Sequence, residues 1–138
     1  MKTSLITCLL LCLAATGWAQ TDKILYQTFA VSDTTQTIQL DIVGEVEYEP
    51  WPADRLMAET SVMLEGAPPR IMEFLIEQGR YALLGAGLET LKVESRDKER
   101  RKIEYKGTTC FEQVKVKIFI PKNFELDEGR NALIRTEE

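Results

Sequence analysis

Three carboxylates stand at alternate positions in the segment EVEYE. Glu45, Glu47 and Glu49 would point from one face of an extended strand, with neighbours about 6.5–7 Å apart. That spacing lies within the range of the paired carboxylates of inverting glycosidases, which flank a cleft and work in different surroundings. Neighbours on one strand face share their surroundings, so we interpret the three glutamates as a solvated face. Weak calcium binding is the alternative, because hard cations take several converging oxygens.

Other catalytic combinations are incomplete. The sequence contains no histidine, the side chain that most often serves as general base, metal ligand or triad partner. Ser95 and Lys98 match the S-x-x-K spacing of penicillin-recognising enzymes, but Lys106-Gly107-Thr108 inverts the K-T-G order that those enzymes also need. We therefore predict no catalytic residue, no cofactor and no metal, and a protein that is not an enzyme.

Aromatic side chains offer a possible binding surface. Tyr48, Trp51 and Tyr81 are the natural candidates for a ligand platform, because aromatic faces stack on the apolar C–H faces of sugar rings. Trp51 lies between Pro50 and Pro52, a position that exposes the ring if the turn projects from the domain. The alternative is that the ring folds back and caps the core beside the turn.

A second candidate surface is a run of charged residues that is basic overall. We predict a hairpin tip here with a local net charge of +3, which either docks an acidic partner or phosphate-bearing surface glycolipid, or only keeps the tip soluble. The basic residues are Arg96, Lys98, Arg100, Arg101 and Lys102, interleaved with Asp97 and Glu99.

The elements that must position these residues are mostly strands. Apolar and polar residues alternate with a period of two along most of the chain, and Pro50 and Pro52 mark a turn between two such segments. The predicted strands cover residues 23–31, 37–43, 45–49, 55–64, 81–84, 88–95 and 111–120, with a last one over 124–127 or 132–135.

One short helix interrupts the strands. Residues 69–78 place Ile71, Phe74 and Leu75 on one side, and the segment opens after proline and closes before Gly79. With the strand pattern, this predicts a core drawn from many elements. Its members are Ile38, Leu40, Ile42, Val46, Val62, Phe74, Leu75, Val93, Val114, Val116, Ile118 and Ile120.

The first nineteen residues have the form of a secretory signal peptide. Lys2 precedes an apolar run over residues 5–15, and Gly17 and Ala19 occupy the small positions before the expected cleavage. The run is shorter than the roughly twenty residues of a membrane-spanning helix. Lipidation at Cys12 is the alternative, although Leu9-Leu10-Leu11 is a poor match to the usual preceding triplet. We expect export to the periplasm or cell surface, with no integral membrane segment after cleavage.

Cleavage would leave residues 20–138 as a single acidic β-rich domain. Lys2 is the only charge removed, so 16 basic residues face 22 acidic ones, a net charge of −6 that disfavours nucleic-acid binding. Cys110 would be the one remaining cysteine, so no internal disulfide can form. We expect its thiol to be buried as a small hydrophobic group.

Two strand motifs follow one another in the order of a known family. The first has the form G-x-V-x-V, with tyrosine at the last position, and the second the form V-x-V-x-I-x-I-P-x-x-F. The residues are Gly44, Val46 and Tyr48, then Val114, Val116, Ile118, Ile120, Pro121 and Phe124.

These motifs resemble those of the adhesin-type domains of secreted bacterial proteins, a family of β domains that are like the heads of auto-transporter adhesins. The resemblance covers residues 36–127 and implies stacked β-coils and an adhesin-like role. Members of that family continue well past the second motif, so a truncated β-stack is one expectation for residues 20–138.

We therefore predict a mainly β fold, an antiparallel sandwich or coil-like β-stack with one short helix near residues 69–78. The predicted function is an exported, non-enzymatic envelope or surface domain that binds a protein or glycan. The alternative is a structural or accessory component of an envelope assembly that pairs through exposed strand edges.

Overall fold

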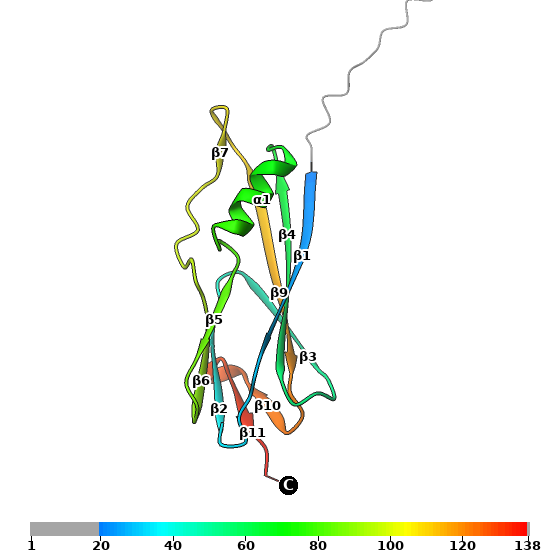
Figure 1. Cartoon of the computed structure of the whole chain (residues 1–138), viewed down its shortest axis with the longest axis vertical. Coiled ribbons are helices and arrows are strands. Elements are labelled where there is room, and N and C mark those ends of the chain that lie inside the picture. The colour runs from blue at the N-terminus through cyan, green and yellow to red at the C-terminus, as the bar shows by residue number, and fades with distance from the viewer. Residues whose placement is uncertain (1–19, 138) are drawn as a thin grey trace, which may run out of the picture.

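The computed structural model describes residues 20–137, so the predicted signal peptide over residues 1–19 lies outside the described residues. The prediction of a mainly β fold with one short helix is confirmed. Two sheets face one another over the lower half of the elongated molecule, and the helix covers the upper half of the longer one (Figure 1).

The first sheet has four strands in the order β1-β4-β9-β3. They are β1 (Gln20–Phe29), β4 (Leu56–Glu65), β9 (Phe111–Ile120) and β3 (Glu45–Pro50). β4 is antiparallel to both β1 and β9, whereas β3 runs parallel to β9. β1 pairs with β4 at all ten of its residues without a bulge, from Gln20 opposite Glu65 to Phe29 opposite Leu56.

The second sheet has five strands in the order β10-β11-β2-β6-β5. They are β10 (Phe124–Asp127), β11 (Ala132–Arg135), β2 (Thr37–Asp41), β6 (Thr90–Ser95) and β5 (Leu83–Ala86). β2 and β6 are parallel, so each sheet is mixed. Both segments predicted as alternatives for the last strand are strands, joined by a 3-10 turn over Glu128–Arg130.

Alternation along β2, β4, β6 and β9 puts one set of side chains between the two sheets. Of the predicted core residues, Ile38, Leu40, Val62, Val93, Val116, Ile118 and Ile120 are buried. Ile42, Val46, Val114 and Leu75 are partly buried at its margins. Leu56, Leu64 and Leu133, which the sequence analysis omitted, are fully buried.

Helix α1 (Pro69–Glu77) corrects one predicted core residue, since Phe74 is 54% exposed. The helix packs instead through Met72, which is fully buried, and through Ile71, Leu75 and Ile76. The buried face of the helix is therefore rotated from the expected one. It centres on Met72, which packs with Val62 and Leu64 of β4, and not on Phe74.

The charged run over residues 96–102 is not a hairpin tip, which corrects a second prediction. The run is irregular, and the hairpin follows it as β7 (Glu104–Tyr105) and β8 (Thr108–Thr109), with Lys106 and Gly107 at the turn. Both turn residues have positive φ. Within the described part of the chain, no helix is long and apolar enough to cross a membrane.

The two flanks of the sandwich differ. On one flank the Gln27 side chain of β1 bonds to the backbone of Leu83 in β5, and the Phe29 ring fills the space beside Gly85. On the other flank a cavity separates β3 from β2. One side of the core is therefore closed by direct contacts, and the other has an opening.

Candidate binding sites

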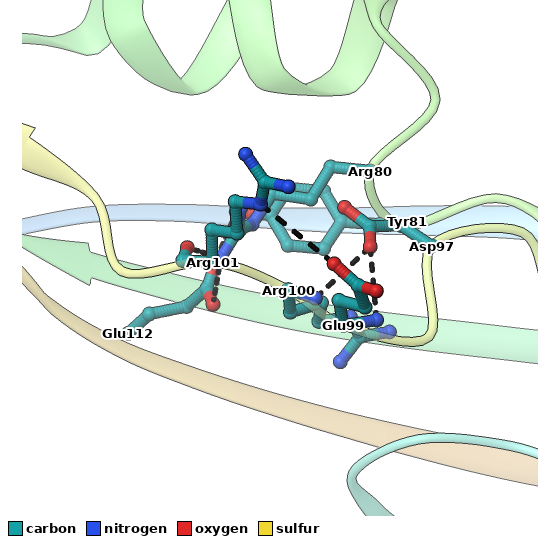
Figure 2. Close-up of polar contacts among 7 residues, drawn as sticks. All are labelled: Arg80, Tyr81, Asp97, Glu99, Arg100, Arg101 and Glu112. Carbon is teal, nitrogen blue, oxygen red and sulfur yellow. Dashed lines mark hydrogen bonds and ion pairs between the residues drawn. The ribbon is translucent and has the colours of Figure 1, made fainter.

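Tyr81 is part of a buried polar cluster and cannot be a ligand platform. Its side chain is 1% exposed, and its hydroxyl donates a 2.5 Å hydrogen bond to the carboxylate of Glu112 (Figure 2). Arg80 donates two further hydrogen bonds to the same carboxylate, at 2.9 and 3.0 Å. Burial, with Glu112 as hydrogen-bond acceptor and negative charge, raises the pKa of Tyr81 well above its ordinary range. The cluster joins the end of α1 to β9.

Trp51 lies on a different surface. Its indole N–H donates to the carbonyl oxygen of Arg55 at 2.9 Å, and its ring packs against Phe119 with 5.7 Å between centroids. Phe119 is on the outer face of the four-stranded sheet, opposite Met57 and Glu49. The ring thus folds back onto the turn and the outer face, away from both Tyr48 and Tyr81.

The basic run does not form one patch. Lys98 is in ion pairs with Asp41 at 2.7 Å and Glu94 at 2.8 Å, and these bonds raise its pKa. Arg96 lies over Gly79. Arg100 turns inward, 5.8 Å from the centre of the Tyr81 ring, and burial lowers its pKa. Arg96, Lys98, Arg101 and Lys102 are all exposed, but Lys98 is held by its two carboxylates and Arg101 lies 3.7 Å from Glu99. The five basic side chains are therefore not presented together to an acidic partner.

The three glutamates of β3 face outward, as the alternation predicts, and two are in ion pairs with β9. Glu47 lies 2.8 Å from Lys115, and Glu49 lies 3.5 Å from Lys117. The Lys115 ammonium lowers the pKa of Glu47. This pairing favours the ionised carboxylate of Glu47, and both lysines compete with any other cation for the two glutamates. Among residues 20–137 no group of three or more acidic, cysteine or histidine side chains is arranged to hold a metal ion.

The outer face of the four-stranded sheet is more apolar near β1. Ile24 and Tyr26 are 55% and 61% exposed, and they share this face with Ser61 of β4 and Lys115 of β9. Because Ser61 is small, a shallow cavity of about 340 Å³ opens beside Ile24 and Met63. β1 is also the edge of its sheet, and no strand of the described chain pairs with its second side.

Tyr48 lines the open flank. A cavity of about 360 Å³ lies between β3 and the end of β2, bounded by Leu40, Asp41, Ile42, Gly44, Val46, Tyr48 and Asn131. Burial and the negative charge of Glu128 raise the pKa of Tyr48. The sequence identified Tyr48 and the Gly44 turn. It gave no signal for Asn131, because this residue reaches the cavity through the pairing of β11 with β2, more than eighty positions away.

The three predicted platform residues are therefore in three places: a buried cluster, an outer face and a flank cavity. Comparison with known protein families, with curated proteins and with solved structures found no match for this chain. The adhesin-type resemblance stays a prediction that rests on the two strand motifs.

Proposed function

We propose that this chain is an exported, non-enzymatic domain that binds an extended segment of a partner protein along β1. The observation that carries the proposal is the β1 edge itself: ten residues, fully in register with β4 on one side, with no described strand on the other. An unpaired edge presents backbone N–H and C=O groups that can accept a further strand.

The other sheet edges are less suited to this role. β3 ends at Pro50 and carries three glutamates, and both features discourage strand addition. β5 and β10 have four residues each, and β5 already contacts Gln27 and Phe29 of β1. β1 contains neither proline nor glycine. Lys23 is the only charged residue among those of its side chains that alternate toward the inner face of the sheet.

The side chains beside this edge indicate what kind of segment would fit. Ile24 and Tyr26 stand next to each other on the outer face, so an added strand would place its own alternate apolar residues against them. The net charge of the chain after the predicted cleavage is −6, which favours a neutral or basic partner over an acidic one. The partner is therefore an extended segment in which apolar and polar residues alternate and whose net charge is neutral or basic.

Two features of the sequence support the remaining parts of the proposal. Residues 1–19 have the composition of a signal peptide, which supports export. The lack of histidine and the engagement of the β3 glutamates with Lys115 and Lys117 support a binding role rather than catalysis.

The test is site-specific photo-crosslinking in intact cells of the source organism. A photoreactive residue at position 24 or 26 should give an adduct with a defined protein, whereas the same residue at position 111 should not. Phe111 is a matched control because it is 58% exposed on the same face but belongs to the central strand β9. Equal adducts at all three positions, or none, would overturn the proposal. An adduct of twice the chain's own mass would identify a second copy as the partner.

A further inference from the structure

The open flank carries an inference that is independent of the β1 edge. Its cavity of about 360 Å³ falls within the ~300–1,000 Å³ of small-molecule sites. Leu40, Ile42 and Val46 belong to the apolar core that continues into this flank, and the ring of Tyr48 packs against the same core. A ligand entering the cavity would therefore meet part of this aliphatic and aromatic surface on its inner side, within a lining that is more polar than apolar overall.

The rim of the cavity is polar. β3 pairs on one side with β9, and no strand of residues 20–137 pairs with its other side. β11 pairs with β2 only as far as Gln39, and the next contact joins the Leu40 N–H to the Asn131 carbonyl oxygen at 2.9 Å. Beyond it, the backbone from Asp41 onward has no neighbouring strand on this side within the described chain. The rim thus presents backbone donors and acceptors together with the Asn131 side chain.

Charge narrows the class of ligand. No lysine or arginine belongs to the lining. The two cations nearest to it are Lys98, which pairs with Asp41, and Arg100, whose guanidinium lies beside Gly44 with its Nε and Nη2 buried, so neither faces the cavity as a free cation. Asp41 is the only ionised group in the lining, and its carboxylate is already held by Lys98 at 2.7 Å, which lowers its pKa. A charged ligand would lose its hydration in the cavity without gaining an oppositely charged partner. A neutral ligand with hydroxyl groups has a smaller desolvation cost and can form hydrogen bonds with the rim.

Gly44 forms a tight turn at the entrance of the cavity and places no side chain there. Its φ of +113° is a conformation that L side chains rarely adopt, and a Cβ here would lie 3.1 Å from the carbonyl oxygen of Val114. The turn between β2 and β3 can therefore fold tightly over the cavity without a side chain at this point.

We propose that this flank cavity binds a neutral sugar ring, with Tyr48 stacked on its C–H face and Asn131 and the rim backbone bonded to its hydroxyl groups. An apolar ring face and a periphery of hydroxyls match the apolar inner side and the polar rim of the cavity. The site involves neither the edge nor the outer face used by the proposed protein partner.

The test is a two-dimensional NMR titration of the purified domain with cellobiose, maltose and chitobiose, each up to about 10 mM, which detects Kd values in the ~1 mM range. At least one disaccharide should shift the backbone amides of Gly44, Val46 and Asn131 in a saturable way. Tyr48→Ala should abolish these shifts, whereas Tyr48→Phe should weaken the affinity by no more than about tenfold, the equivalent of one hydrogen bond. Phe111→Ala, on the outer face of β9, should change nothing.

Asn131→Gly provides a second variant if Tyr48→Ala does not fold. Asn131 has φ +49°, which glycine adopts readily, so this change removes only the side chain. It should weaken the binding of the same disaccharide. The proposal is overturned if none of the three sugars shifts these amides, if the shifts survive both Tyr48→Ala and Asn131→Gly, or if glucose 6-phosphate shifts them as strongly as a neutral sugar.

Discussion

The side-chain amide of Gln27 makes two hydrogen bonds to the backbone of Leu83. Its Nε2 donates to the Leu83 carbonyl oxygen at 3.1 Å, and its Oε1 accepts from the Leu83 N–H at 2.8 Å. Leu83 is at the edge of the five-stranded sheet and Gln27 at the edge of the four-stranded one. Where the two sheets meet, the Gln27 side chain therefore makes the two backbone hydrogen bonds that a neighbouring strand would otherwise make. It satisfies both the N–H and the C=O of the buried Leu83.

Replacing Gln27 by alanine should destabilise the domain by about 2 kcal/mol, because the buried Leu83 N–H and C=O would both lose their partner. Urea unfolding measures the change. Gln113→Ala is the control, since Gln113 is exposed on the outer face and should cost less than about 0.5 kcal/mol. If the two variants were equally stable, water would be replacing the amide and the flank would not be closed.

Tyr81→Phe should lower the free energy of unfolding by about 2 kcal/mol. The change removes one hydroxyl and leaves a largely buried carboxylate, Glu112, with Arg80 as its remaining hydrogen-bond donor. Tyr48→Phe is the matched control: Tyr48 lines the open flank, where water can reach the phenol, so its loss should cost less than about 0.5 kcal/mol. A Tyr81→Phe protein as stable as the wild type would contradict the role of this hydrogen bond.

Stability should fall more steeply at alkaline pH in the wild type than in Tyr81→Phe. In the unfolded chain Tyr81 loses its proton near its ordinary pKa of 10.0, whereas in the folded protein the pKa is raised by burial and by Glu112. Above about pH 10 the unfolded state therefore holds fewer protons than the folded state, so raising the pH favours unfolding. The stability from this group is complete below that pH and is lost above it.

The slope should approach about 1.4 kcal/mol per pH unit for this single group. Urea unfolding at several pH values between about 9 and 11 measures it for both proteins. All other ionisable groups are the same in the two proteins, so the difference between the two curves isolates Tyr81. Parallel curves would mean that the phenol ionises equally in the folded and unfolded states.

Two glycines with positive φ should respond differently to alanine. Gly107 has φ +76°, and a Cβ there meets nothing within 4 Å, so Gly107→Ala should cost about 1 kcal/mol for the backbone conformation alone. Gly87 has φ +107°, and its Cβ would lie 2.0 Å from the Thr90 carbonyl oxygen. Gly87→Ala should cost about 3 kcal/mol, because the turn between β5 and β6 must also move. Thermal unfolding that gave equal losses would contradict this difference.

The sequence predicted those elements that have a clear period of two. β2, β3, β4 and β9 follow it closely, since one face of each is covered and the other is wet. The β7–β8 hairpin has two residues in each strand, too few for any periodicity to show. The parallel pairing of β2 with β6 and of β3 with β9 could not be predicted either, because alternation does not encode which strands become neighbours.

The candidate sites were harder to predict than the strands. Tyr81 and Arg100 look like surface residues in the sequence, since tyrosine and arginine usually reach water. Tyr81 is covered because Glu112 of β9 supplies a carboxylate that makes burial of the phenol and of Arg80 tolerable, and Arg100 packs over the Tyr81 ring. Only the pairing of distant strands reveals this partner.

The position of β9 and β11 in their sheets has a consequence for the time order of folding. β9 lies between β4 and β3, and β11 lies between β10 and β2, so the latest strands along the chain occupy interior places. The four-stranded sheet cannot be completed until residues up to 120 are available, nor the five-stranded sheet until residues up to 135 are. Such distant pairings make folding slow, on the order of milliseconds to seconds. A newly made chain would therefore remain without complete sheets for longer than a hairpin-built protein of equal size.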